Sequence, residues 1–153
     1  MLIIDGHLDL AWNALQWNRN LLLDAGILRV LENRLPGPGR AQNTVTFPDM
    51  IRGKVAVCCA TLLARCTGVA VPDIDFAIPE QAFGIAQGQL AFYRAMEQRG
   101  VLRILTSGAD LDAHIAAWEA WDAAQDSTGT APPLGCIISM ESADPIPDPG
   151  DLP

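Results

Sequence analysis

A histidine and an aspartate lie one residue apart near the start of the chain, at His7 and Asp9. If this segment is a β-strand, both side chains leave the same face, roughly 6–7 Å apart along the backbone. An imidazole nitrogen and a carboxylate oxygen at that spacing can converge on one divalent cation. A His-x-Asp pair arises often by chance, so the chemistry depends on what else lies near it.

A third ligand candidate, Glu141, ends an apolar run that begins at Leu134. A carboxylate has two oxygens and can bridge two metal ions about 3.5–4 Å apart. A set of histidine, aspartate and glutamate suits zinc and also accepts manganese or cobalt. The second histidine, His114, has helical spacing from Leu111 and Trp118, so we expect a packed or surface residue and not a ligand.

Three segments predict the strands that carry these side chains. Residues 54–64 and 134–141 are nearly continuous apolar runs, as in parallel strands buried on both faces. Residues 2–9 alternate, which predicts two distinct faces. The expected faces are Leu2, Ile4 and Leu8 on one side and Ile3, Asp5, His7 and Asp9 on the other.

Helical patterns separate these strands. Residues 10–32 are mixed and partly helical, and residues 33–48 predict a long loop through a Pro-Gly-Pro-Gly sequence. A helix is expected from Pro79 to Gly100, with a short extended piece at 102–105 after it. Its expected core face is Phe83, Ala86, Leu90, Tyr93 and Met96.

Ser107 and Asp110 resemble a capping box that starts a second helix, which should bury Trp118 and fade near Gln125. Strands that alternate with helices predict an α/β fold with a parallel sheet. Ligands of such folds bind at the carboxyl ends of the strands. The three ligand candidates, His7, Asp9 and Glu141, all occupy that kind of position.

Two motifs resemble a known family. Residues 5–12, Asp-Gly-His-Leu-Asp-Leu-Ala-Trp, resemble the Asp-Gly-His-x-Asp-Leu-x-Trp pattern that opens the membrane (renal) dipeptidases, peptidase family M19. Residues 138–144 resemble the later family strand that ends in a Glu-Gly-Ala type motif, with Ser142 in place of the glycine. Residues 148–152 are similar to the loop before the next helix of the family.

The resemblance implies a (β/α)8 TIM barrel of the metal-dependent hydrolase superfamily, two zinc ions and a dipeptide substrate. It implies that His7 and Asp9 bind the first metal, that Glu141 bridges both, and that Trp12 lies near the substrate pocket. A metal-activated hydroxide would attack the peptide carbonyl. Many relatives in the superfamily use a carboxylated lysine as the bridge, but Lys54, the only lysine, starts its strand at the wrong end for a site.

A barrel of this kind needs about 250 residues, whereas this chain has 153. We therefore expect residues 1–153 to be the N-terminal part of a single barrel domain, with about three of its strands and the C-terminal part absent. The full-length parent would be the dipeptidase, and this chain alone would be inactive. A non-catalytic truncated remnant and another metal-dependent amide or lactone hydrolase remain open, and a homodimer would cover an open sheet edge.

Composition excludes several other classes. The net charge of −8, from 10 basic and 18 acidic residues, argues against nucleic acid and anionic membranes as partners. The N-terminus has no signal-peptide pattern, and no apolar run approaches the roughly 20 residues of a membrane span, so we expect a cytoplasmic protein. The four cysteines form no Cys-x-x-Cys pair, which leaves zinc-ribbon and thioredoxin functions without support.

Overall fold

A four-stranded parallel sheet forms the centre of the fold in the computed structural model, which describes residues 1–69, 71, 74–124, 129–148 and 150. The strands are β1 (Ile3–Leu8), β2 (Val55–Leu62), β3 (Leu102–Ile104) and β4 (Leu134–Met140). All neighbouring strands pair in parallel, in the order β1-β2-β4-β3. The predicted α/β class and parallel sheet are confirmed.

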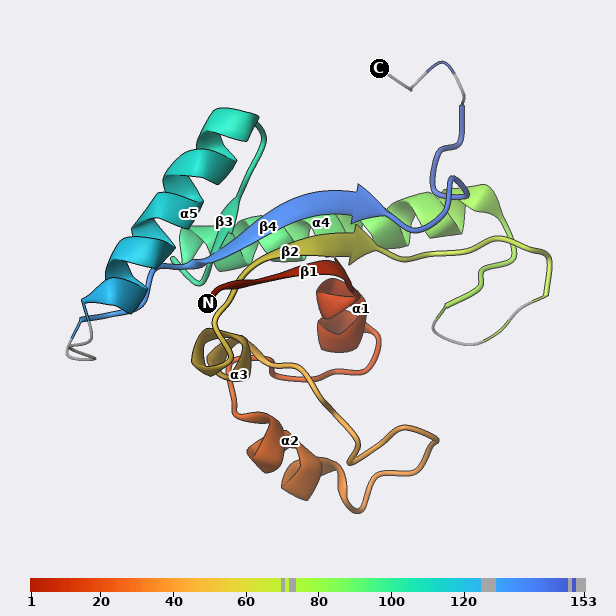
Figure 1. Ribbon diagram of the computed structural model, residues 1–153. Helices are drawn as coiled ribbons and strands as arrows, with labels where there is room; N and C mark the ends of the chain where they lie inside the picture. The colour runs from red at the N-terminus through yellow and green to blue at the C-terminus, as the bar shows by residue number, and fades with distance from the viewer. Residues whose placement is uncertain (70, 72–73, 125–128, 149, 151–153) are drawn as a thin grey trace.

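Five helices accompany the sheet within the described residues. They are α1 (Leu10–Leu15), α2 (Ala25–Glu32), α3 (Phe47–Arg52), α4 (Pro79–Gln98) and α5 (Gly108–Ala123). Figure 1 shows α1, α2 and α3 on the β1 side, while α4 runs along the sheet and α5 lies beside β3. None of these helices has the length and apolar composition needed to cross a bilayer.

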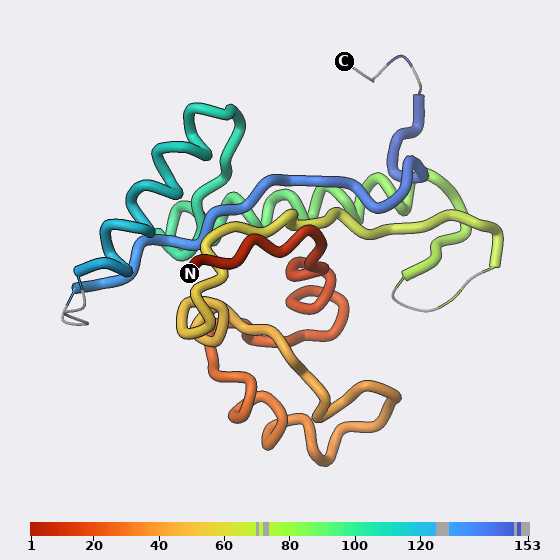
Figure 2. The backbone as a smooth tube through the Cα atoms, in the orientation of Figure 1, coloured from red at the N-terminus to blue at the C-terminus, as the bar shows by residue number. Residues whose placement is uncertain are grey.

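The three long strands, β1, β2 and β4, lie side by side, while the short β3, which precedes β4 in the chain, lies on the far side of β4. The short extended piece expected at 102–105 contains a true strand, β3, which pairs with the first half of β4. The smooth trace in Figure 2 shows the same succession of segments. Gln125, residues 126–128 of the linker, and residues 149, 151 and 152 of the family-like tail lie outside the described residues.

The predicted two-faced alternation of residues 2–9 is wrong. The side chain of Ile4 is 61% exposed, whereas Leu2 and Leu8, which share its expected face, pack partly buried against the core. The pairing also shifts: Asp5 lies opposite Cys58 and Leu8 opposite Ala60, so β1 holds one residue more than β2 over this stretch. This bulge breaks the period of two. Asp9 is not in the strand but occupies the N-cap position of α1.

The N-terminal helices also differ from expectation. The mixed segment 10–32 resolves into two short helices, α1 and α2, and the loop expected to reach residue 48 ends earlier because α3 begins at Phe47. Thr46 caps α3 by accepting a hydrogen bond from the Asp49 N–H. The Thr-x-x-Asp pattern around a proline is a helix-start signal.

The predicted helices α4 and α5 are confirmed, and most of their expected core residues pack. Tyr93 and Trp118 are fully buried, and Ser107 caps α5 by accepting from the Asp110 N–H at 3.1 Å. The prediction that Phe83 belongs to the core face of this helix is wrong, because its side chain is 41% exposed. The buried face of α4 instead includes Gln89, whose amide makes two hydrogen bonds to the backbone of Leu63 just after β2.

His114 is buried in α5, so the expected packed position is confirmed. Its Nε2 lies 3.0 Å from the carbonyl oxygen of Ala56, and burial lowers its pKa, which favours the neutral imidazole. The ring packs directly against Gly135 of β4, where an added Cβ would lie 2.6 Å from His114 Nε2. Only a residue without a side chain fits this crossing of helix and sheet.

Replacing Gly135 with alanine is expected to lower the free energy of unfolding by about 1–3 kcal/mol, because the new methyl overpacks against the His114 ring. Urea denaturation of the purified chain measures the change. Gly88→Ala in α4 is the matched control: nothing lies within 4 Å of its Cβ position, so alanine should stabilise the helix by about 0.5–1 kcal/mol. Equal effects of the two substitutions would contradict this packing.

Candidate metal centre

The three predicted ligands meet at the carboxyl ends of β1 and β4. His7 is the second-to-last residue of β1, and Asp9 directly follows that strand. Glu141 directly follows β4. The Glu141 N–H donates a hydrogen bond of 3.1 Å to the Leu62 carbonyl, which ties this position to the end of β2. Because all three strands are parallel, their carboxyl ends share one edge of the sheet.

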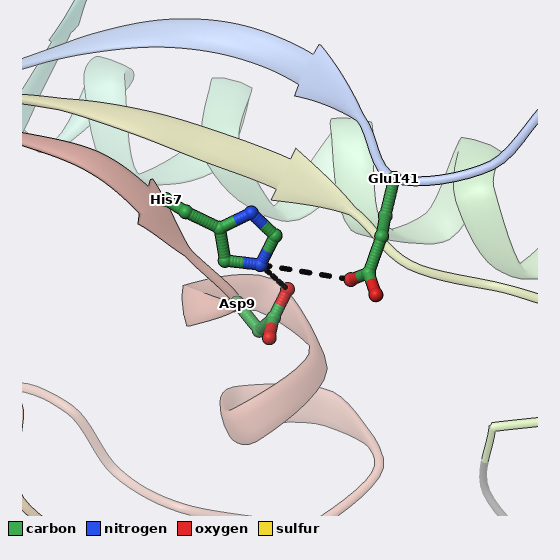
Figure 3. A group of neighbouring side chains, drawn as sticks. All are labelled: His7, Asp9 and Glu141. Atoms are coloured by element: carbon green, nitrogen blue, oxygen red, sulfur yellow. Dashed lines mark ion pairs between the residues drawn. The ribbon is translucent and has the colours of Figure 1, made fainter.

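The ligand atoms converge on one point (Figure 3). His7 Nε2 lies 3.5 Å from Asp9 Oδ1 and 3.7 Å from Glu141 Oε2. One ligand atom from each residue lies within 4.8 Å of the other two. Zinc bonds of about 2.0–2.2 Å place tetrahedral ligand atoms roughly 3.3–3.6 Å apart. Small side-chain adjustments would therefore bring the three atoms around one ion.

The donor set fits a divalent metal. One imidazole and two carboxylates are the ligand types that zinc, manganese and cobalt accept. The side chains are 55%, 27% and 39% exposed for His7, Asp9 and Glu141, so the cluster is open to solvent. Among the residues that the structure describes, no other group of three or more His, Cys, Asp or Glu side chains converges in this way.

Trp12 lies apart from the ligand cluster. A pocket of about 200 Å³ is lined by His7 and Asp9 together with Arg19 and residues 42–45. Trp12 instead lines a different hollow of about 530 Å³, with Trp17 and the Pro-Gly-Pro segment 36–38. Its ring lies 5.3 Å from that of Trp17. The structure thus brings His7, Asp9 and Glu141 together and places Trp12 beside another opening.

Lys54 lies outside the centre, as expected. It precedes β2 and forms an ion pair with Asp122 at the end of α5, far along the sheet from the carboxyl ends of the strands.

A buried polar network supports the Asp9 backbone, and sequence reasoning missed it. The Asp9 carbonyl accepts hydrogen bonds from the N–H and the Nδ2 of Asn13, at 3.0 and 2.9 Å. Asn13 Oδ1 accepts from Arg19 Nη1 at 2.6 Å. Arg19 in turn makes two hydrogen bonds to Glu32, at 2.7 and 3.0 Å. In the sequence, the residues of this network appear only as scattered polar positions, most of them within the mixed, partly helical segment 10–32.

The Arg19–Glu32 pair is well compensated. Both side chains are over nine-tenths buried, and Glu32 also accepts hydrogen bonds from Arg40 and from the Ala41 N–H. The Arg19 hydrogen bond is the main reason that the pKa of Glu32 falls to about 2, although burial opposes the shift. The guanidinium groups of Arg19 and Arg40 also lie over the Trp17 ring, 4.5 and 4.8 Å from its centroid.

A four-stranded parallel α/β sheet with candidate ligands at its carboxyl edge fits part of a TIM-barrel-like fold. Two solved structures share the fold. One is the dipeptidase AC, a metallopeptidase of family M19, with a TM-score of 0.60 and 20% identity. The other is a metallopeptidase from Rhodobacter sphaeroides, solved with a phosphinate mimic of the dipeptide L-Ala-D-Ala, with a TM-score of 0.57 and 18% identity.

Each alignment covers 95% of this chain. The chain spans only 36% and 39% of the two solved proteins. At this level of identity the likeness shows the fold, and it confirms the resemblance to M19 dipeptidases at that level. No protein-family model and no curated protein matches the sequence.

Glu32→Gln should destabilise the chain by about 3 kcal/mol at neutral pH, because it leaves the buried Arg19 without its counter-charge. The folded-state pKa of Glu32, about 2, lies below its ordinary value of 4.5. The stabilisation is therefore complete above the ordinary value and disappears as the pH falls toward 2. Urea denaturation at a series of pH values should show the difference between wild type and variant shrinking over that interval.

The exposed Glu119 of α5 provides the control, since Glu119→Gln should change the free energy of unfolding by less than about 0.5 kcal/mol. A difference between wild type and Glu32→Gln that stays constant from pH 5 to pH 2 would refute the assigned ion pair.

Proposed function

We propose that residues 1–153 supply the first part of a metal-dependent dipeptidase barrel, with His7, Asp9 and Glu141 as metal ligands. The observation that carries the proposal is the convergence of one ligand atom from each residue within 4.8 Å at the carboxyl ends of the strands. The M19 fold supports it. The Rhodobacter sphaeroides protein carries a phosphinate mimic of a dipeptide, which supports a dipeptide as the proposed substrate.

Zinc is the proposed metal, and two zinc ions are proposed for the complete barrel. When bound, zinc supplies Lewis acidity toward a carbonyl oxygen and activation of water at neutral pH. In the proposed site, His7 would offer an imidazole nitrogen, and Asp9 and Glu141 would offer carboxylate oxygens whose charge balances a divalent cation. Glu141 has a second carboxylate oxygen, which suits the proposed bridge to the second ion.

We propose that this chain alone does not turn over dipeptides. It spans less than two fifths of the solved M19 proteins, and it brings three ligand side chains together where a two-metal site needs more. The strand β1, which carries His7, pairs only with β2 among the described strands, so the sheet edge beside His7 is open. Metal binding and catalysis are therefore separable in the experiment.

The test is zinc titration of the purified chain by calorimetry, with wild type, His7→Ala and Glu141→Gln. Wild type is expected to bind about one equivalent, and each variant should lose more than the roughly 10–100-fold in affinity that removal of an outer-sphere partner costs. Asp112→Asn, at an exposed position of α5, is the control and should keep the wild-type affinity.

Hydrolysis of L-Ala-D-Ala is measured in parallel, and none is expected from residues 1–153. Equal zinc affinity in wild type, His7→Ala and Glu141→Gln would remove the ligand assignment. Zinc-dependent turnover by the chain itself would instead remove the claim that it is incomplete.

A further inference from the structure

A buried hydroxyl group lies behind the Asp9 carboxylate. Thr61, near the end of β2, is 2% exposed, and its Oγ1 donates a hydrogen bond to Asp9 Oδ1. The same Oγ1 lies 3.2 Å from the Leu8 carbonyl oxygen. Carboxylates and carbonyls only accept, so a single hydroxyl proton serves both acceptors. The charged carboxylate is the stronger of the two.

The acceptor atom is the one that matters for the metal centre. Asp9 Oδ1 is also the oxygen that lies 3.5 Å from His7 Nε2. A carboxylate oxygen has two lone-pair directions, and a hydrogen bond from Thr61 along one of them leaves the other for a cation. The hydroxyl therefore selects which oxygen faces His7 and fixes the rotation of the Asp9 side chain.

Thr61 is itself held by a second buried hydroxyl. Tyr93 of α4 is fully buried, donates to the Thr61 carbonyl at 3.0 Å and accepts from the Ala11 N–H at 3.1 Å. It thereby joins the end of β2 to the first turn of α1, immediately after Asp9. Burial raises the pKa of Tyr93, so the phenol keeps its proton and its donor role across the working pH range.

We propose that Thr61 is a positioning residue, which aims Asp9 Oδ1 at the metal centre, and that Tyr93 locks Thr61 in that role. The inference rests on the proposed function in so far as Asp9 is taken as a ligand. Outer partners of this kind fix the orientation of metal ligands, and their loss typically costs about 10–100-fold in metal affinity. Neither Thr61 nor Tyr93 is assigned as a metal ligand.

Two substitutions separate positioning from packing. Thr61→Val keeps the shape and removes the hydroxyl, whereas Thr61→Ser keeps the hydroxyl and removes a buried methyl group. If Thr61 acts by positioning, Thr61→Val weakens Co²⁺ binding roughly 10–100-fold and alters the visible Co²⁺ spectrum. Thr61→Ser should then stay within about threefold of wild type even where urea denaturation shows that it is less stable.

Tyr93→Phe extends the test to the second hydroxyl. It should weaken Co²⁺ binding in the same direction as Thr61→Val, because the Thr61 carbonyl and the Ala11 N–H lose their shared partner. A Thr61→Val chain with the wild-type Co²⁺ affinity and spectrum would overturn the proposal. So would equal losses in the valine and serine variants that follow their loss of stability.

A metal-free readout keeps the two proposals distinguishable. The ¹³Cγ chemical shift of Asp9 reports the hydrogen bond directly and should move in Thr61→Val but not in Thr61→Ser. If the wild-type chain binds no Co²⁺, the ligand assignment under the proposed function falls, and this shift alone decides whether Thr61 orients Asp9. An unchanged shift in Thr61→Val would overturn the positioning role whatever the metal result.

Discussion

Parallel pairing of β1, β2 and β4 is the constraint on which the rest of the structure depends. It places the last residues of all three strands at one edge of the sheet, so side chains more than 130 positions apart in the chain, His7 and Glu141, come within 3.7 Å. Parallel strands also need crossover segments, which put helices on the sheet and bury β2 on both faces. The site and the core are thus two consequences of one pairing pattern.

Burial of β2 leaves backbone groups at its end without water as a partner, and side chains of α4 form hydrogen bonds with these groups. Where β2 runs out, backbone groups of Thr61 and Leu63 lie inside the protein and need partners. Tyr93 and Gln89 supply them, at positions four residues apart on one helix face. Helix α4 therefore also helps to fix the position of Thr61, whose hydroxyl donates to Asp9.

Sequence reasoning succeeded where a pattern is local. The continuous apolar runs identified β2 and β4, and the Ser107 cap identified the start of α5. It failed at β1, because a bulge opposite Cys58 is decided by pairing with another strand. It also missed the Arg19–Glu32 pair, whose partners are 13 residues apart and meet only when α2 folds back. The structure brings His7 Nε2 and Asp9 Oδ1 within 3.5 Å of each other, although Asp9 occupies the N-cap of α1 and not the strand.

The candidate centre is unequally supported on its two sides. Asp9 is held through its carboxylate by Thr61 and through its carbonyl by Asn13, so its position is set before any ion arrives. The His7 ring is 55% exposed, and the partners of its Nε2 are the carboxylates of Asp9 and Glu141 themselves. If the centre binds a cation as proposed, part of the binding free energy would go into ordering the exposed His7 side chain. In the proposed site, burial of the His7 side chain against a further segment would reduce this cost without any change in the ligands.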